Sequence, residues 1–479
     1  MYYNTGINNN IKLVLSGKAN YTLIPLIVLS VFVSVLLYIA FQMQQGLLSL
    51  LVVVSLLLVF LIINYPKFWI YTVIGFTFVY FKETSGGISP VDYASAVLYS
   101  GSLLVWITWM KLVKRVKITD SAADWLIILF YVCFILNFIV ALANGNDMLG
   151  WLREALRGII ILYFIPIKYY FSDNKDLKKL FFVFGISVII SATWQFYDYY
   201  KALQLDAVYL FQLATGVRLN QALFSAAAVF GFSFLIFFTK MKNQLFAFLV
   251  TSLSVAGLFT SFSRSFWLTI GLNTFIIFLF VPIRKKVKII IYVFMSLAVL
   301  VTVMNQILGD KSKYMGMIVE NRVGSSFKGK KDVSVDMRLV EYKSVFARIA
   351  ENPLGGNGMG SKIKFYHSGN KATTLTHNIH NSYLFTAQRY GIPLAIVFFA
   401  AILLYLIKSF KLAISIKDKM DKMLILGAFN TLLMLIITSF VTAIFYYRDG
   451  SVVTALTLAV VGIIDNRYRN IKGEQNYGR

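Results

Sequence analysis

The sequence predicts an all-α polytopic membrane protein, and two observations carry this prediction. Hydrophobic residues make up 58% of the 479-residue chain, and the mean hydropathy of +0.71 is far above that of soluble globular domains. Apolar runs of about 20 residues recur along the sequence, and each is long enough to cross a bilayer as a helix. The fold class is therefore a helical bundle embedded in lipid.

The apolar runs also give the order of the predicted elements. The sequence contains fourteen such segments, at about 22–41, 46–64, 67–81, 91–110, 125–143, 156–171, 178–197, 222–239, 244–261, 264–283, 288–308, 384–407, 423–445 and 450–464. They predict three parts, namely a bundle of eleven helices at 1–308, a large external loop at 309–383, and three helices with a cytoplasmic tail at 384–479.

The orientation follows from the basic residues. Lysine and arginine gather in alternate loops, as in KLVKRVK (111–117), KDLKK (175–179), RKKVK (284–288) and the segment 408–422. Cytoplasmic loops carry such an excess, so the pattern predicts that both termini are cytoplasmic. The formal net charge of +25 is explained by these loops and predicts no nucleic-acid partner.

The loop at 309–383 is basic although its predicted place is outside, with twelve Lys and Arg against six Asp and Glu. Attraction to lipid headgroups explains such a charge, and so does a binding surface for an anionic substrate. Within it, SVDMRLVEYKSVFARIAENPLGG has apolar residues at helical spacing, which predicts an amphipathic helix that Pro353 ends. GGNGMG (355–360) follows, and it fits either a plain turn or a backbone cradle for a phosphate.

All three histidines of the chain lie in this loop, as His367, His377 and His380. Their spacing allows a three-histidine metal site, but it is not a usual ligand spacing and no acidic partner is evident. His380 and Asn381 are predicted at the N-terminus of the next helix, where the helix dipole favours a neutral imidazole. Neutral imidazole is the form that a general base needs, so His380 is the candidate base. His377 has the weaker claim and fits an ordinary loop histidine as well.

Several arginines are predicted on the same outer face. Arg264, in SFSRSFW, lies between two spans joined by almost no loop, where a charge needs a partner or a function unless it reaches the headgroups. Arg218 opens the eighth span, Arg153 and Arg157 flank the sixth, and Arg338 lies on the amphipathic helix. Because arginine suits two-pronged phosphate contacts, their convergence would make a pyrophosphate site.

These residues together resemble the O-antigen ligase/polymerase superfamily, which includes the Wzy-type polymerases. The signature loop of the family runs from an arginine through an amphipathic helix to Pro-x-x-Gly-x-Gly, then His-Asn-x-Tyr-Leu and a glycine. The matching positions here are Arg338, Pro353, Gly356, Gly358, His380, Asn381, Tyr383, Leu384 and Gly391. Ser263 and Arg264 resemble an earlier Ser-Arg pair of the family, and Arg218 resembles its outer arginine more loosely. An acidic residue often precedes the family's glycine, whereas Gln388, Arg389 and Tyr390 stand here.

The resemblance implies a metal-independent glycosyltransferase without a cofactor, built on a GT-C-like helical bundle in the bacterial inner membrane. It implies an inverting transfer from a glycan on undecaprenyl pyrophosphate at the periplasmic face. The expected partners are lipid-linked glycans as donor and acceptor, membrane lipids and, as a further candidate, a chain-length regulator protein. His380 would be the base, and Arg264, Arg338, Arg218, Arg157, Asn381 and His377 would bind substrate.

Three functions stay open from the sequence. A polymerase would transfer the glycan to a second lipid-linked repeat unit, and a ligase would transfer it to the lipid A core. Fourteen spans favour the polymerase, because the ligases resemble a twelve-span plan. A lipid-linked oligosaccharide flippase is the third reading, but the sequence has few charges within its spans and no clear internal repeat.

Overall fold

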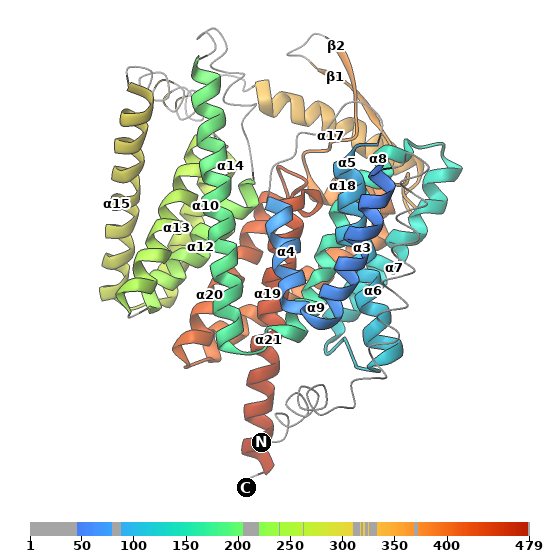
Figure 1. Cartoon of the computed structure of the whole chain (residues 1–479). Helices are drawn as coiled ribbons and strands as arrows, with labels where there is room; N and C mark the ends of the chain where they lie inside the picture. The colour runs from blue at the N-terminus through green and yellow to red at the C-terminus, as the bar shows by residue number, and fades with distance from the viewer. Residues whose placement is uncertain are drawn as a thin grey trace. The chain divides into compact units, whose positions relative to one another are not determined.

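A computed structural model shows that the described part of the chain is mostly helical (Figure 1). It describes residues 46–78, 88–204, 220–238, 240–261, 263–309, 333–367 and 372–477, and the single residues 317, 320 and 324. The chain divides into two compact units, Met1–Tyr65 and Pro66–Arg479. The described part of the first unit is α3 (Gly46–Asn64), an apolar helix that matches the predicted segment 46–64. The predicted first span, 22–41, lies outside the described residues.

The second unit opens with helices that follow the predicted segments closely. Its first half contains α4 (Pro66–Phe78), α5 (Pro90–Ser95), α6 (Ser102–Thr108), α7 (Ala122–Ala143), α8 (Met148–Gly158), α9 (Phe164–Tyr170) and α10 (Asn174–Gln204). Two π-helical segments, η1 (Ala96–Gly101) and η2 (Trp109–Val113), continue α5 and α6, and the 3₁₀ segment η3 (Ile159–Tyr163) joins α8 to α9.

The second half carries the predicted external loop. Its elements are α12 (Gln221–Phe237), α13 (Met241–Thr260), α14 (Arg264–Phe280), α15 (Ile283–Leu308), α17 (Val333–Glu351), β1 (Ile363–His367), β2 (Ala372–Thr376), α18 (Ser382–Tyr390), α19 (Ile392–Ser415), α20 (Lys419–Thr438), η6 (Ile444–Tyr446) and α21 (Arg448–Tyr477). The amphipathic helix expected in the loop is α17. Strands β1 and β2 form an antiparallel hairpin, with Ile363 opposite Thr376, which the all-α expectation did not include.

Seven helices in the described part are long and apolar enough to cross a membrane. They are Val91–Val113, Ala122–Ala143, Asn174–Lys201, Met241–Thr260, Ile392–Ser415, Lys419–Thr438 and Arg448–Asn470. Gln221–Phe237 and Arg264–Phe280 are shorter apolar helices. The predicted class, a mostly helical multi-pass membrane protein, is confirmed on this basis.

Helices α12 and α21 form the centre of the bundle. Nearly every residue of α12 is buried, and α12 packs against α13 and α20. A helix that is apolar on all sides belongs inside a bundle, and small residues let its neighbours approach closely. Gly231 illustrates this, since a Cβ there would lie 2.0 Å from the Thr251 hydroxyl of α13.

The predicted span 384–407 is wrong at its start, because the chain breaks at Gly391. Residues 382–390 form the separate short helix α18, and the long apolar helix α19 begins only at Ile392. Gly391 has a φ of +86°, a conformation that glycine adopts readily and that residues with a Cβ disfavour. A Cβ there would also lie 2.0 Å from the carbonyl oxygen of Leu354. The break is therefore built around a packed loop.

The elements of the predicted loop lie together at one end of the second unit. Helix α17 packs against α18 and β1, and the amide of Ser382 in α18 donates a hydrogen bond to Ser439 at the end of α20. In Figure 1, α17 and the hairpin lie at the upper end of these helices, and the last turns of α21 extend at the lower end. We call the upper end the α17 end.

Candidate active site

The first turn of α18 is held by its N-cap, Asn381. The Asn381 side-chain oxygen accepts a hydrogen bond of 3.0 Å from the Leu384 amide, and its Nδ2 donates to the Phe440 carbonyl at 3.1 Å. An asparagine N-cap satisfies one of the amides that a helix start leaves unpaired. The second bond ties the α18 start to the segment after α20. The predicted helix start at Asn381 is thus confirmed, and it fixes the backbone of the residue before it, His380.

Glu341 on α17 holds His380 by two contacts. Its Oε1 accepts a hydrogen bond from the His380 backbone amide at 2.6 Å, and its Oε2 lies 2.8 Å from His380 Nδ1. The Glu341 side chain is only 4% exposed, whereas the His380 side chain is 48% exposed. A carboxylate acceptor keeps the imidazole proton on Nδ1, which leaves Nε2 as a free acceptor. This is the arrangement that a general base needs.

Glu341 was missed by the sequence analysis, although the sequence contains a signal for it. It lies four residues before Val345 and eight before Ile349, on the buried face of α17. A carboxylate on the apolar face of an amphipathic helix requires a partner, because an unpaired buried charge is costly. That partner is a histidine 39 positions further along the chain, which helical spacing alone does not identify.

Two tyrosines surround the pair. The Tyr342 hydroxyl lies 2.8 Å from the carbonyl oxygens of both His380 and Phe440, so it fastens α17 to the residues around α18. Burial raises the pKa of Tyr342, and the Asn381 side chain and the charge of Arg338 oppose this rise. Arg338 therefore lies near the His380 site, on the same helix as Glu341.

A second predicted arginine, Arg157, acts electrostatically on another tyrosine, Tyr447. Burial raises the pKa of Tyr447, a hydrogen bond with Thr442 lowers it, and the charge of Arg157 lowers it further. The charge of Glu341 acts on Tyr447 in the opposite direction. Arg157 of α8 and Glu341 of α17 thus lie close to the same phenol. The charges of Arg338 and Arg157 thus act on two tyrosines, Tyr342 and Tyr447, that also feel the charge of Glu341.

Arg264 is the first residue of α14, next to its N-cap Ser263, and its side chain is half-buried. The Ala222 amide in the first turn of α12 donates a 2.8 Å hydrogen bond to Asp449, at the start of α21. Helix α13 follows α12 after a short connection and runs antiparallel to it. The end of α13 and the start of α14 therefore lie at the α17 end of the unit.

Arg218 lies outside the described residues. Arg153 pairs with Asp92 of α5 through its Nε and NH2 at 3.1 and 2.9 Å.

His377 differs from His380 in its surroundings. Its Nε2 lies 3.3 Å from Asp147 at the start of α8, and its ring packs over Gly150, where a Cβ would be 2.8 Å from the ring. Burial lowers the pKa of His377. Its Nδ1 has no hydrogen-bond partner among the described residues. The two histidines thus face different carboxylates from different helices, and a substrate-binding role for His377 stays a prediction.

The described residues contain no group of three or more His, Cys, Asp or Glu side chains placed to hold a metal ion. The side chain of His367 is outside the described part. His377 and His380 each lie against a separate carboxylate, so these two residues are not arranged as ligands of one ion.

The GGNGMG loop is a buried turn, and the phosphate cradle considered for it is wrong. The amides of Asn357 and Gly358 donate to the carbonyls of Gln388 and Arg389, at 2.8 and 3.0 Å. The amides of Met359 and Gly360 donate to the side chains of Asn137 and Glu154, at 2.8 and 3.0 Å. These four amides already donate to protein acceptors, so they are not available to bind a phosphate.

Glycine is required in this turn for two reasons. Gly356, Gly358 and Gly360 all have φ between +71° and +81°. A Cβ on Gly356 would lie 2.5 Å from the Arg389 carbonyl oxygen, and the amide of Ile392 donates to the Pro353 carbonyl at 2.8 Å. The proline-glycine segment and the α18–α19 break therefore interlock. The separate motifs of the sequence form one structural unit.

Arg389 lies in the segment before Gly391, where the family often has an acidic residue. Its side chain is fully buried, and its Nε and NH2 donate to the two carboxylate oxygens of Glu154 on α8, at 2.9 and 2.8 Å. The same guanidinium donates to the Ser361 hydroxyl at 2.7 Å and to the His377 carbonyl at 2.8 Å. Arg389 is thus a structural cation that joins α18, α8 and the loop that carries the histidines.

A comparison with known protein families matches the part of the chain that contains these motifs. Residues 246–399 match a family model described as O-antigen ligase. The match covers Arg264, Arg338, the glycine turn and His380, and it does not reach Arg157 or Arg218. It confirms the predicted resemblance to the O-antigen ligase/polymerase superfamily and indicates a glycosyltransferase-like enzyme in a multi-pass membrane protein. No curated protein matches the chain.

Proposed function

We propose that this protein polymerises lipid-linked polysaccharide repeat units of the O-antigen or capsule type. The donor is a glycan on undecaprenyl pyrophosphate, and the acceptor is a sugar hydroxyl of a second lipid-linked unit. The proposal places a GT-C-like bundle of fourteen spans in the bacterial cytoplasmic membrane, with both termini cytoplasmic. The α17 end then faces the periplasm.

The observation that carries the proposal is the His380–Glu341 pair. A sugar hydroxyl is a weak nucleophile, and it gains from a base within hydrogen-bond reach. His380 offers an accessible Nε2, and Glu341 holds the ring through Nδ1 and the backbone amide. The buried carboxylate also stabilises the positive charge that the ring gains when it takes a proton.

The reaction is a single displacement. His380 Nε2 takes the proton of the acceptor hydroxyl as its oxygen forms a bond to the anomeric carbon of the donor. The bond from that carbon to the pyrophosphate oxygen breaks, and the leaving group departs with the electron pair. Attack from the face opposite the leaving group inverts the anomeric centre. The acceptor is lengthened, undecaprenyl pyrophosphate is released, and the proton passes from His380 to solvent.

The leaving group needs charge stabilisation rather than a proton, because a pyrophosphate is already a good leaving group. Arg338 and Arg157 are two of the proposed arginines, and their charges act on Tyr342 and Tyr447. Arg264, at the start of α14, and Arg218, which lies outside the described residues, complete the proposed pyrophosphate site. With arginines supplying the positive charge, the proposed reaction has no step that requires a metal.

An O-antigen ligase is the second candidate, because the matched family model carries that description. Donor, base and pyrophosphate site would be the same, and the acceptor would be the lipid A core. A flippase for lipid-linked oligosaccharides is the third reading, and it leaves the His380–Glu341 pair without a chemical role.

Incubation of the purified protein with lipid-linked repeat units alone tests the proposal. A ladder of lengthened lipid-linked chains is the expected product. A product that forms only after lipid A core is added would identify a ligase. Movement of labelled lipid-linked units across vesicles without any elongation, in the presence of either acceptor, would contradict a glycosyltransferase.

A further inference from the structure

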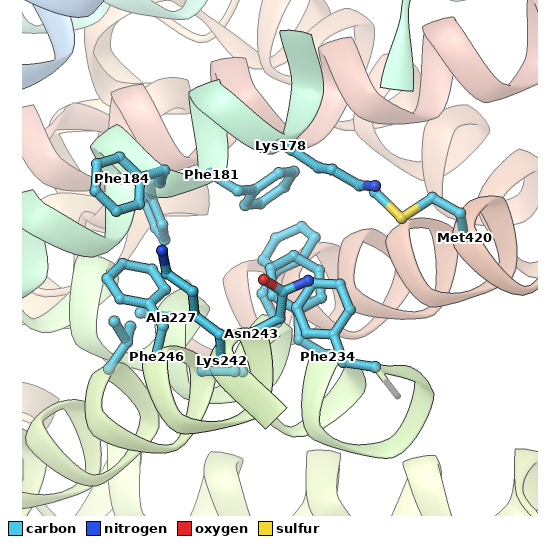
Figure 2. Close-up of a pocket in the computed structure, with 15 residues that line it drawn as sticks. Lys178, Phe181, Phe184, Ala227, Phe234, Lys242, Asn243, Phe246 and Met420 are labelled. Carbon is cyan, nitrogen blue, oxygen red and sulfur yellow. The ribbon is translucent and has the colours of Figure 1, made fainter. Parts of the chain in front are cut away.

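A cavity at the end of the bundle away from α17 has the chemistry of a lipid site. It lies between the start of α10, the end of α12 and the start of α13, with Met420 of α20 at its edge, and its volume is about 220 Å³ (Figure 2). These helix ends are opposite to the ends that carry Arg264 and Asp449. The cavity is therefore separate from the candidate active site.

Seven of the fifteen residues that line the cavity are phenylalanines. Phe181 of α10 lies between Phe230 and Phe234 of α12, with ring centroids 4.9 and 5.1 Å away. Phe182 of α10 stacks on Phe246 of α13 at 5.1 Å. Apolar cavities of about 150 Å³ stay dry in proteins and bind small hydrocarbons. A larger one with this lining favours hydrocarbon over water.

The edge of the cavity is positively charged. Lys178 of α10 and Lys242 of α13 both line it, and both side chains are exposed. Figure 2 shows the two lysines on different sides of the phenylalanine rings, with the Asn243 amide between them. The described residues that line the cavity include no Asp or Glu. An apolar interior beside two exposed cations is complementary to a hydrocarbon chain attached to an anionic headgroup.

We propose that this cavity binds one acyl chain of an anionic glycerophospholipid, with the lipid phosphate beside Lys178 and Lys242. Because α10, α12 and α13 pack around the chain, the bound lipid fills space between helices that would otherwise stay empty. The surrounding packing is tight, as Gly185 shows, since a Cβ there would lie 2.7 Å from the Phe246 ring. Selectivity for anionic lipids follows from the two lysines rather than from the apolar wall.

Photolabelling tests this site. The protein is reconstituted in phosphatidylcholine vesicles that contain a trace of phosphatidylglycerol with a diazirine near the end of one acyl chain. We expect labelled peptides from 178–184, 227–238 and 243–250, and unlabelled phosphatidylglycerol should compete at least tenfold better than phosphatidylcholine. Equal competition by both lipids would overturn the proposal, and so would preferential displacement by a polyprenyl phosphate.

Matched lysine variants separate the site from general surface charge. Lys178→Gln and Lys242→Gln should each weaken labelling roughly fivefold, the size expected for one lysine near an anionic lipid surface. Lys179→Gln and Lys240→Gln remove exposed lysines from the same helix ends but outside the cavity lining, and they should leave labelling unchanged. Equal losses in all four variants would contradict a specific site.

A cavity-filling variant gives an independent readout. Ala227→Leu adds three carbons inside the cavity and should abolish labelling at 178–184. If this variant does not fold, the four lysine variants decide the question by themselves. Undiminished labelling in folded Ala227→Leu would show that the acyl chain does not enter the cavity.

Discussion

The α17 end and the phenylalanine-lined cavity are built by opposite means. At the α17 end, hydrogen bonds and ion pairs hold α8, α17, α18 and the glycine turn, and Arg389 of α18 alone contacts Glu154 of α8, Ser361 and the His377 carbonyl. Around the cavity, α10, α12 and α13 meet through aromatic rings without a comparable polar network among the described residues. Directional bonds fix a side chain in one position, whereas rings in an apolar wall adapt to what fills the space.

This difference indicates where the protein needs precision. A base must be held to a fraction of an ångström relative to its substrate, and supporting contacts provide this. A site for a lipid chain needs only shape and apolar surface. Substitutions at the two ends should therefore differ in kind, with loss of activity or folding at the α17 end and milder effects near the cavity.

His380→Ala should have the largest effect on activity. General base catalysis contributes roughly 10²- to 10⁴-fold, and we expect a loss of that size in glycan transfer with normal protein levels. The rate of lengthening of lipid-linked units by purified protein measures it. His377→Ala tests the predicted substrate contact separately, because its ring faces Asp147 rather than Glu341. Full activity in His380→Ala would remove His380 from the proposed mechanism.

Arg389→Met should have the largest effect on stability. Removing one partner of a buried ion pair leaves the Glu154 carboxylate uncompensated, at a cost of about 3–5 kcal/mol. Denaturant titration of the purified protein in detergent measures this change. The double variant Arg389→Met, Glu154→Met should recover part of the loss, because it removes both charges. A double variant as unstable as the sum of the two single ones would show that the pair is not coupled.

Glu341→Gln should reduce activity by up to roughly 10²-fold, the lower end of what general base catalysis contributes, while the protein stays folded. One carboxylate oxygen accepts from the His380 amide and the other from Nδ1, whereas glutamine replaces one of these oxygens by an NH2 group that cannot accept. The turnover number should fall more than the apparent affinity for the lipid-linked acceptor, since the change acts on the base. Glu351→Gln, at an exposed position at the end of α17, is the control. A purely structural role for Glu341 would lower protein yield and leave the turnover number of the folded fraction unchanged.

Phe234→Leu should have the smallest effect, about 1 kcal/mol of stability, because a shape change in an apolar wall can be absorbed by its neighbours. The rate of glycan transfer should stay within about twofold of that of the parent protein, because neighbouring side chains adjust to the smaller side chain. Denaturant titration and the elongation assay measure both. A loss of activity as large as that of Glu341→Gln would show that the cavity and the α17 end are coupled, which contradicts their separate roles.

The sequence alone determined the helical class, the approximate bounds of most helices and the start of α18 at Asn381, because apolar runs and N-cap residues act locally. It also predicted His380 as the base and Arg264, Arg338, Arg218 and Arg157 as substrate contacts, and these roles stay predictions. Three features came only from the tertiary structure. Glu341 accepts hydrogen bonds from His380, Arg389 is buried against Glu154, and the glycine turn packs against the break at Gly391. Each joins residues that are 35 to more than 200 positions apart, as in the Glu154–Arg389 pair with its separation of 235. Hydropathy and helical spacing report the surroundings of one segment, and the identity of a partner depends on how segments pack.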